Sequence, residues 1–229
     1  MSISVFLPTR KGSERVKNKN TRQFSDFEGG LLELKLKQLA KLEKVDEVIL
    51  STNDEASISV AKKIEVDFPK LRIDARPDAL ALGTTSLNDL IAYVPTITRC
   101  DNILWTHVTS PMVDTEIYEE CIMSFNEGLE NGFDSLMSVT AFQNFLWKKE
   151  LNDIINRIGK ERWPKTQDLE MLYEINSAVF ITPKEIYKSK GDRVGEKPYL
   201  FEMNKLTSLD VDWEEDFKIA EAVYDKFKE

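Results

Sequence analysis

Short, continuous apolar runs alternate along the chain with longer segments in which apolar residues recur every three or four positions. The continuous runs predict buried strands at residues 3–7, 46–52, 102–108, 134–140 and 177–182. The periodic segments predict amphipathic helices at residues 31–42, 56–68, 86–93, 112–129 and 184–189, and a terminal helix from Trp213. Strands that are apolar throughout and separated by helices are typical of a mostly parallel sheet with helices on both faces. The pattern therefore predicts the α/β fold class.

The alternation of strands and helices stops over residues 141–174. This excursion is too polar for a layer of the core and too aromatic for a linker. It combines large aromatic side chains with cations, among them Phe142, Phe145, Trp147, Trp163, Lys148, Lys149, Arg157, Lys160, Arg162 and Lys165. We interpret the excursion as a segment that packs on a partner subunit.

The composition is that of an ordinary soluble protein, with 229 residues of which 41% are hydrophobic and 31% charged. No apolar run approaches the roughly 20 residues that a membrane-spanning helix needs, and the apolar start is too short for a signal peptide. The two cysteines, Cys100 and Cys121, show no metal-binding spacing, so we expect a cytoplasmic protein with no membrane partner. A net charge of -9 argues against a nucleic-acid partner, because binding to a phosphate backbone needs a basic face.

Positive charge is nevertheless concentrated directly after the first predicted strand, where parallel sheets bind their ligands. Residues 8–22 contain a single acid and six basic side chains, Arg10, Lys11, Arg15, Lys17, Lys19 and Arg22. The loop matches neither the P-loop nor the dinucleotide-binding glycine pattern, which disfavours NTPases and dehydrogenases of those types. Backbone amides near Gly12, together with cations such as Arg10 and Lys19, would suit a triphosphate. A solvated basic loop is the alternative interpretation.

Two acids near the end of the chain form a second candidate site. Asp210 and Asp212 are two residues apart in an extended segment, so their carboxylates point to the same side. Paired carboxylates next to bound phosphates commonly hold Mg²⁺. Asp212 has a further candidate role as the N-cap of the terminal helix, with Glu215 completing a capping box. A cap uses one carboxylate oxygen, so the two roles are compatible.

Two more segments contain candidate binding residues. In "RPDALALGTTSLNDL", Arg76 stands at the exit of a strand. Thr84, Thr85 and Ser86 then precede a helix, where they are candidates either for its N-cap or for ligand binding. The segment "THVTSPMVD" contains His107, the chain's only histidine. No nucleophile motif accompanies it, so triad chemistry has no support.

Taken together and in this order, these segments resemble the acylneuraminate cytidylyltransferases, also called CMP-sialic acid synthetases, and their 3-deoxy-manno-octulosonate relatives. The family's opening, A-R-x-G-S-K-R-x-x-x-K-N, is similar to "TRKGSERVKNKN" here. Later family segments are similar to "RPDALALGTTS", "THVTSP", "NSAVFIT" and "SLDVDWEEDFKIAE". The resemblance covers nearly the whole chain except residues 141–174.

The resemblance implies a single Rossmann-like domain over residues 1–229 and transfer of CMP from CTP to a 2-keto sugar acid. It also implies Mg²⁺ as cofactor, and a homodimer in which the excursion reaches the neighbour's site. The residues that match the family's nucleotide site are Arg10, Gly12, Ser13, Lys19, Asn20, Arg76, Thr84 and Ser86. Those in the sugar segments are Thr109, Ser110 and Asn176, and those that match the metal-binding acids are Asp210 and Asp212.

The same resemblance implies that the anomeric hydroxyl of the sugar attacks the α-phosphorus in line and that pyrophosphate leaves. Arg10, Lys19 and Mg²⁺ would absorb the charge that grows on the leaving group. No general base is assigned by position. Asp210 acting through a metal-bound water is one hypothesis for that role.

Departures from the family pattern lie on the presumed sugar side. His107 and Val113 stand where members commonly have Gln and Arg, Gly83 replaces an acid, and Glu174 lies near a position that is often basic. CTP is therefore a firmer expectation than sialic acid, and a legionaminate- or pseudaminate-type acceptor stays open. His107 is a candidate sugar contact. Lys197, or a cation of the excursion, is a candidate replacement for the lost contact to the sugar carboxylate.

Three alternatives stay open at this point. The chain is also compatible with a sugar-1-phosphate nucleotidylyltransferase, a glycosyltransferase on a similar fold, or an inactive nucleotide-binding homologue. The last alternative is disfavoured because a dead site has no physical need for its charges, which are those of Arg10, Lys19, Asp210 and Asp212. A surface glycan is the usual destination of the family's products.

Overall fold

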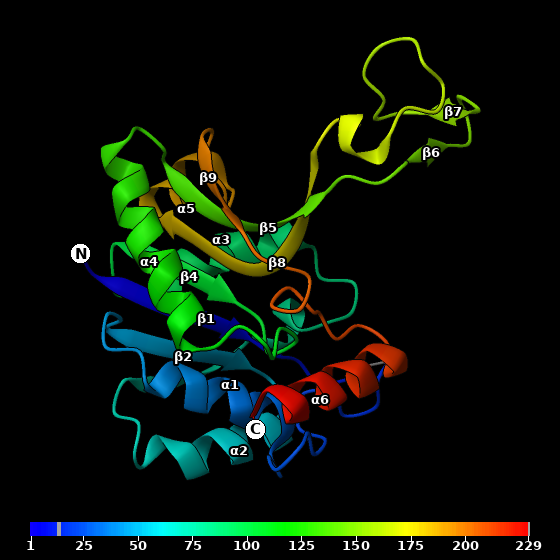
Figure 1. The fold of residues 1–229 in the computed structure, drawn as a ribbon. Helices are drawn as coiled ribbons and strands as arrows, with labels where there is room; N and C mark the ends of the chain where they lie inside the picture. The colour runs from blue at the N-terminus through cyan, green and yellow to red at the C-terminus, as the bar shows by residue number, and fades with distance from the viewer. Residues whose placement is uncertain (13–14, 229) are drawn as a thin grey trace.

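Within the described residues of the computed structural model, 1–12 and 15–228, seven strands form one sheet in the order β3-β2-β1-β4-β8-β5-β9 (Figure 1). Their bounds are β1 Ile3–Pro8, β2 Glu47–Thr52, β3 Leu71–Ala75, β4 Asn102–Thr106, β5 Ser135–Phe142, β8 Leu172–Pro183 and β9 Pro198–Glu202. Neighbouring strands pair in parallel except for β8, which runs antiparallel to both β4 and β5. The mostly parallel α/β sheet expected from the sequence is confirmed.

The direction of β8 follows from the path of the chain. After β5 the chain leaves the sheet and forms the short strands β6 (Trp147–Lys148) and β7 (Asp153–Ile154) and a 3₁₀ turn, η2 (Thr166–Asp168). It then returns beside the point of departure, because Phe142 at the end of β5 pairs with Leu172 at the start of β8. A strand that starts where its neighbour ends must run in the opposite direction.

Helices cover both faces of the sheet, as predicted (Figure 1). Their bounds are α1 Gly30–Ala40, α2 Glu55–Glu65, α3 Leu87–Ile97, α4 Thr115–Glu130, α5 Lys184–Lys190 and α6 Glu214–Lys228. Val5 and Leu7 of β1 belong to a core shared with α1, α2, α4 and α6, whereas Phe6 belongs to a core shared with α3 and α5. Successive residues thus enter different cores, which explains why the strand is apolar at every position. None of the described helices is long and apolar enough to cross a membrane.

Four helices differ by two or more residues from their predicted bounds. The α1 helix ends at Ala40 and α2 at Glu65, before the predicted ends at residues 42 and 68. The α4 helix begins at Thr115 instead of residue 112, because the Asp114 side chain accepts a hydrogen bond from Ile117 N–H at 3.1 Å and caps the helix there. The α3 helix continues to Ile97, past the predicted end at residue 93, although it contains Pro95. The strand β9 was not predicted, since it is short and starts at a proline.

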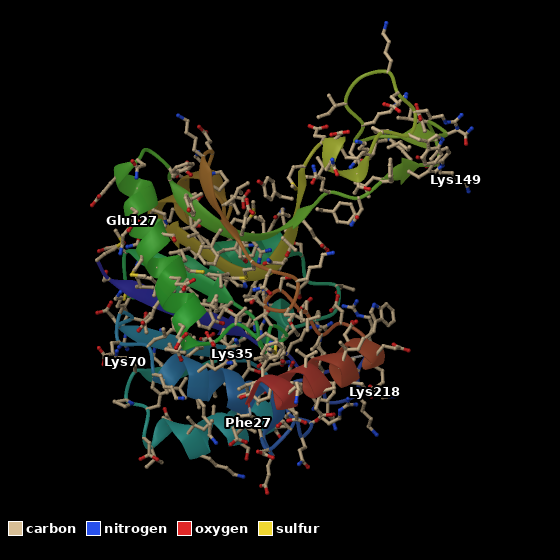
Figure 2. The ribbon with its side chains drawn as sticks, viewed as in Figure 1. Phe27, Lys35, Lys70, Glu127, Lys149 and Lys218 are labelled. Carbon is tan, nitrogen blue, oxygen red and sulfur yellow. The ribbon has the colours of Figure 1, made fainter. Side chains whose placement is uncertain are left out.

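The excursion forms an arm, defined here as residues 143–171, that extends away from the sheet (Figure 1). Lys149 lies near its far end (Figure 2). The arm exposes large apolar side chains, which are Phe145, Trp147, Leu151, Ile155, Ile158, Trp163 and Met171. Packing of this arm on a partner subunit stays a prediction.

Candidate active site

A cavity of about 430 Å³ opens where β1 and β4 end. Trp105 of β4 and Leu87 of α3 contribute to its apolar lining, and the basic loop contributes Arg10, Arg15 and Lys19. The strands β1 and β4 run parallel, so their carboxyl ends meet at this edge, where open α/β sheets bind ligands. The basic loop therefore forms part of a cavity wall and is not merely a solvated surface.

The two acids near the end of the chain lie beside this cavity. Val211, which separates them, is fully buried and donates its N–H to the Thr109 carbonyl at 2.9 Å. The charges of both Asp210 and Asp212 act on the Lys19 ammonium, so both acids lie near the same cation. The Arg15 guanidinium donates to both carboxylate oxygens of Asp212, at 2.9 and 3.2 Å. Cations from the start of the chain and acids from its end therefore meet at one place.

Burial shifts two charged groups at this meeting point toward their neutral forms. It lowers the pKa of the Lys19 ammonium below the usual 10.5, an effect that the charges of Asp212 and Asp210 partly offset. It also raises the pKa of the Asp210 carboxyl above the usual 3.8, although that side chain reaches solvent and a hydrogen bond from Thr109 opposes the shift. Lys19 Nζ donates to the Val211 carbonyl at 2.7 Å and lies 3.6 Å from Asp212 Oδ1.

The predicted capping role of Asp212 is wrong by one residue. The α6 helix begins at Glu214, which puts Trp213 at the N-cap position. The Asp216 carboxylate accepts hydrogen bonds from the backbone N–H groups of Trp213 at 2.7 Å and Asp212 at 3.1 Å. Asp216 is thus the acid that reaches back over the first turn, in place of the predicted Glu215. The Asp212 side chain is consequently left to face the cations.

The two carboxylates fit a Mg²⁺ site that is completed by a bound nucleotide. Mg²⁺ in phosphate-transfer sites is usually held by one or two carboxylates, by water and by the phosphates of the substrate. Asp210 and Asp212 supply such oxygen ligands at the edge of a cavity that Lys19 and Arg10 line. Within the described residues there is no cluster of three or more metal-ligating side chains, so the protein alone offers no complete cage.

Arg76, which was predicted to bind the nucleotide, lines the cavity, but its guanidinium is hydrogen-bonded to backbone carbonyls. Its Nη2 donates to the carbonyl of Ser51 at 2.7 Å and also to the carbonyl of Thr9. Burial lowers the pKa of its guanidinium to about 10, against the opposing charge of Asp74. Arg76 therefore ties the ends of β1 and β2 together beneath the basic loop.

The backbone of the basic loop turns at Gly12, whose φ of +84° lies in the region that favours glycine. The neighbouring Lys11 N–H donates to Asn53 Oδ1 at 3.1 Å, which holds the loop near the end of β2. Asn20 lines the cavity, as its predicted nucleotide role requires. Ser13, also predicted at the nucleotide, lies outside the described residues.

His107 and Thr109, which follow β4, also line the cavity. His107 Nε2 accepts a hydrogen bond from Trp105 Nε1 at 3.1 Å. Burial lowers the pKa of His107 to about 3, and the charges of Arg193 and Lys19 act in the same direction. A neutral imidazole whose Nε2 is an acceptor carries its proton on Nδ1, so His107 has one N–H donor to offer a ligand.

Comparison with known proteins gives the family of the chain. A model of the family described as cytidylyltransferase matches residues 4–227. The chain belongs to the cytidylyltransferase family. It is similar to the pseudaminic acid cytidylyltransferase of Campylobacter jejuni, with 23% identity over 230 residues that cover 98% of this chain and 97% of the relative.

Two further likenesses accompany this match. An N-acylneuraminate cytidylyltransferase of Escherichia coli is 25% identical over 234 residues, which cover 98% of this chain and 52% of that relative. Among solved structures, a CMP:2-keto-3-deoxy-manno-octonic acid synthetase complexed with CTP aligns with a TM-score of 0.67 at 12% identity, covering 99% of this chain and 100% of that one. At that identity the structural likeness supports the fold alone.

In this cytidylyltransferase the loop after β4 is held by a residue that the sequence reasoning missed. Lys35 of α1 is fully buried, and its Nζ donates to the carbonyls of Ser110 at 2.9 Å and Val113 at 2.7 Å (Figure 2 labels Lys35). A signal was present, because Lys35 is three residues after Leu32 and four before Leu39 on the apolar face of the helix. The Ser110 side chain is itself buried, so a sugar in the cavity would contact neighbouring residues of the loop instead.

Thr84 and Ser86 are exposed and are not among the residues that line the cavity. Ser86 caps α3, since its Oγ accepts a hydrogen bond from Asp89 N–H at 3.1 Å. Of the two interpretations of this segment, the structure supports the helix cap directly. Leu87, immediately after the cap, is the residue that reaches the cavity.

Two predicted sugar contacts lie elsewhere. Asn176 uses its side chain within the sheet, where its Oδ1 accepts from Ser138 Oγ at 2.6 Å and its Nδ2 donates to Thr140 Oγ1 at 3.2 Å. Lys197 precedes β9, and its backbone N–H donates to Asp134 Oδ1 at 3.0 Å at the amino end of β5. The cavity lies at the carboxyl ends of β1 and β4, whereas Lys197 lies at the amino ends of β5 and β9. The structure therefore contradicts a contact between Lys197 and a ligand in the cavity of its own chain.

Proposed function

We propose that this chain transfers CMP from CTP to the anomeric hydroxyl of a 2-keto sugar acid and releases pyrophosphate, with Mg²⁺ as cofactor. The observation that carries the proposal is the meeting of the basic loop with Asp210 and Asp212 at one cavity. The family match supports the use of CTP, and the names of the relatives, which act on pseudaminic acid and N-acylneuraminate, support the class of acceptor. A cytoplasmic location, where CTP is supplied, is part of the proposal.

The cations of the cavity bind the triphosphate and receive the charge of the leaving group. A bond forms between the anomeric oxygen and the α-phosphorus while the bond from that phosphorus to the β-phosphate oxygen breaks. Arg10 and Lys19, which line the cavity, would neutralise the pyrophosphate as its charge grows, and Lys19 is held in place by its hydrogen bond to the Val211 carbonyl. Asp210 and Asp212 would hold Mg²⁺, which supplies further neutralisation of the phosphate oxygens when it is bound.

The acceptor sugar would lie on the side of His107 and Thr109. The neutral His107 offers a hydrogen-bond donor but no charge, so it can orient a hydroxyl or carbonyl of the sugar and cannot neutralise its carboxylate. The balancing cation therefore comes from another element. Our candidates for this cation are basic side chains on the arm of a second copy, since Lys197 lies at the amino end of β5, away from the cavity of its own chain.

The proposal includes a homodimer formed through the arm. Trp147 and Trp163 are 49% and 62% exposed in the single chain, and further large apolar side chains surround them on the arm. An exposed apolar patch of this kind is typical of an interaction surface. A second copy of the chain is the partner that would also bring the arm's cations to a neighbouring cavity.

One assay tests the proposed activity. The purified chain is incubated with Mg²⁺, one of the four nucleoside triphosphates and one member of a panel of 2-keto sugar acids, and pyrophosphate is measured. Release that requires both CTP and one sugar acid supports the proposal and names the acceptor. Parallel incubations replace the sugar acid by a sugar 1-phosphate, or the nucleoside triphosphate by a nucleotide sugar. Pyrophosphate release only with the sugar 1-phosphate, nucleoside diphosphate release from the nucleotide sugar, or no release with any pair would refute the proposal.

A further inference from the structure

One arginine near the cavity is held by aromatic rings and by no acid. Arg193 lies in the connection between α5 and β9, and its Cζ is 3.9 Å from the centroid of the Phe180 ring and 5.0 Å from that of the Trp105 ring. Among the described residues, 1–12 and 15–228, its guanidinium has no hydrogen-bond partner and no ion pair. The charge of the adjacent Asp192 acts on it without forming an ion pair.

An arginine in this environment is costly to the folded protein unless a ligand completes it. Arg193 is partly buried, and burial lowers the pKa of its guanidinium below the usual 12.5. The Tyr187 hydroxyl, on which the charge of Arg193 acts, is fully buried and also lacks a hydrogen-bond partner within the part of the chain that the structure describes. An apolar side chain at position 193 would pack on the same rings without this cost. The guanidinium therefore points to a partner that the protein alone does not supply.

The rings that hold Arg193 also place it beside the part of the cavity proposed for the acceptor. Trp105 lines the cavity, and its Nε1 donates to Nε2 of His107, which lines the cavity too. The centroids of these two rings are 6.2 Å apart. The charge of Arg193 acts on His107, so the guanidinium and the imidazole lie near one another. A ligand that contacts His107 therefore borders Arg193.

We propose that Arg193 binds the carboxylate of the acceptor sugar acid. This inference rests on the proposed function and deepens it, because it names a cation of the same chain in place of the arm cations of a second copy. A carboxylate accepts two parallel hydrogen bonds from a guanidinium, and rings that already restrict the guanidinium reduce the entropy lost on binding. The neutral His107 would then donate from Nδ1 to an uncharged oxygen of the same sugar. A phosphate of the nucleotide is the other oxyanion that a guanidinium can bind, and the kinetic experiment below separates the two.

The first experiment measures binding without turnover. Calorimetry compares each member of the panel of 2-keto sugar acids with its uncharged methyl ester, on the full chain and in the presence of CMP, which has no pyrophosphate to release. The wild type should bind one acid about 10- to 100-fold more tightly than its ester, and Arg193→Leu should remove this preference by weakening the acid alone. The matched control is Lys190→Met, because Lys190 lies close in sequence and pairs with Glu196 at 2.8 Å. This control should keep the preference for the acid.

The second experiment is the pyrophosphate assay with the preferred acid. Arg193→Leu should raise KM for the sugar acid about tenfold or more and leave KM for CTP within about twofold, which also shows that the variant is folded. Arg193→Lys should restore part of the loss, because it keeps the charge without the fork.

Four results would overturn the role of Arg193. They are a wild type that binds no acid more tightly than its ester, an acid preference that persists in Arg193→Leu, a rise in KM for CTP, and a preference that is lost when Trp147 and Trp163 of the arm are replaced by Asp. The last result would assign the carboxylate to the arm of a second copy. An acid preference that depends on Arg193 while no pyrophosphate is released would support the role of Arg193 and refute the proposed function, so the two failures are distinguishable.

Discussion

The buried lysine beneath the cavity loop allows a quantitative prediction. Lys35 is fully buried, and burial lowers the pKa of its ammonium from 10.5 to about 7, against the opposing charge of Asp114. The folded state therefore releases this proton more readily than the unfolded state. Because the unfolded chain binds more protons between pH 7 and pH 10.5, the Lys35 contribution to the free energy of unfolding must rise as the pH rises through that window.

The size of the effect follows from the two pKa values. For one group with a folded pKa of about 7 and an unfolded pKa of about 10.5, the free energy of unfolding increases by about 2 kcal/mol between pH 6.5 and pH 8.5. The contacts persist across this range, since a neutral amine retains two N–H donors for the carbonyls of Ser110 and Val113. Lys35→Met removes the titrating group and leaves both carbonyls without their donor, at a cost of about 1–3 kcal/mol for each unsatisfied group.

The assay is urea unfolding of the wild type and Lys35→Met at pH 6.5 and pH 8.5. We expect the stability difference between them to grow by about 2 kcal/mol in favour of the wild type at the higher pH. Lys37→Met is the matched control, because Lys37 lies on the same helix, is 53% exposed and pairs with Glu33. Its difference from the wild type should be the same at both pH values. An equal difference for Lys35→Met at both pH values would refute the reasoning that a buried charge is being relieved.

Three further predictions concern the cavity and the arm. Lys19→Met should lower kcat about 10²- to 10³-fold in the pyrophosphate assay, because a fixed donor to the leaving group is lost. Asp210→Asn should raise the Mg²⁺ concentration needed for half-maximal rate by about tenfold or more; turnover intact at saturating Mg²⁺ would exclude Asp210 as the general base. The double variant Trp147→Asp and Trp163→Asp should convert a dimer into a monomer in sedimentation analysis, and an unchanged sedimentation coefficient would contradict the role of the arm.

The elements that were predictable are those in which one local pattern decides the outcome. The run Ile3–Pro8 is apolar at every position because its alternate side chains enter two different cores, and the sequence shows this directly. The direction of β8 was not readable, since it depends on the path of the arm, which has no periodicity. The start of α6 was predicted one residue early, because Glu215 and Asp216 are both acids and only the backbone geometry shows which one reaches Trp213 N–H.

The site was predictable to the extent that loop position determines it. Arg10, Lys19 and Asn20 follow the first strand, so they had to lie at the edge where the cavity is. Lys197 lies away from the cavity of its own chain because β9 pairs in parallel with β5 and begins at the amino end of that strand, and no sequence feature reveals that pairing. Asn176 was assigned to the sugar from the resemblance of its segment to the family, whereas its amide is hydrogen-bonded to Ser138 and Thr140 of β5, beside the register shift of that strand.

The arrangement of charge itself argues for a metal–nucleotide ligand over a bare anion. Asp210 and Asp212 stand beside a cavity whose cations are Arg10, Arg15 and Lys19, with Arg76 bound to the backbone. A site selected for an anion alone would gain affinity by losing both carboxylates, because each repels the ligand and also reduces the field of the cations. The acids stabilise the bound state only if a cation stands between them and the phosphates. The ligand-free protein supplies cations at this place in Arg15 and Lys19, and a Mg²⁺ ion bound together with the triphosphate would add the charge that both acids and phosphates require.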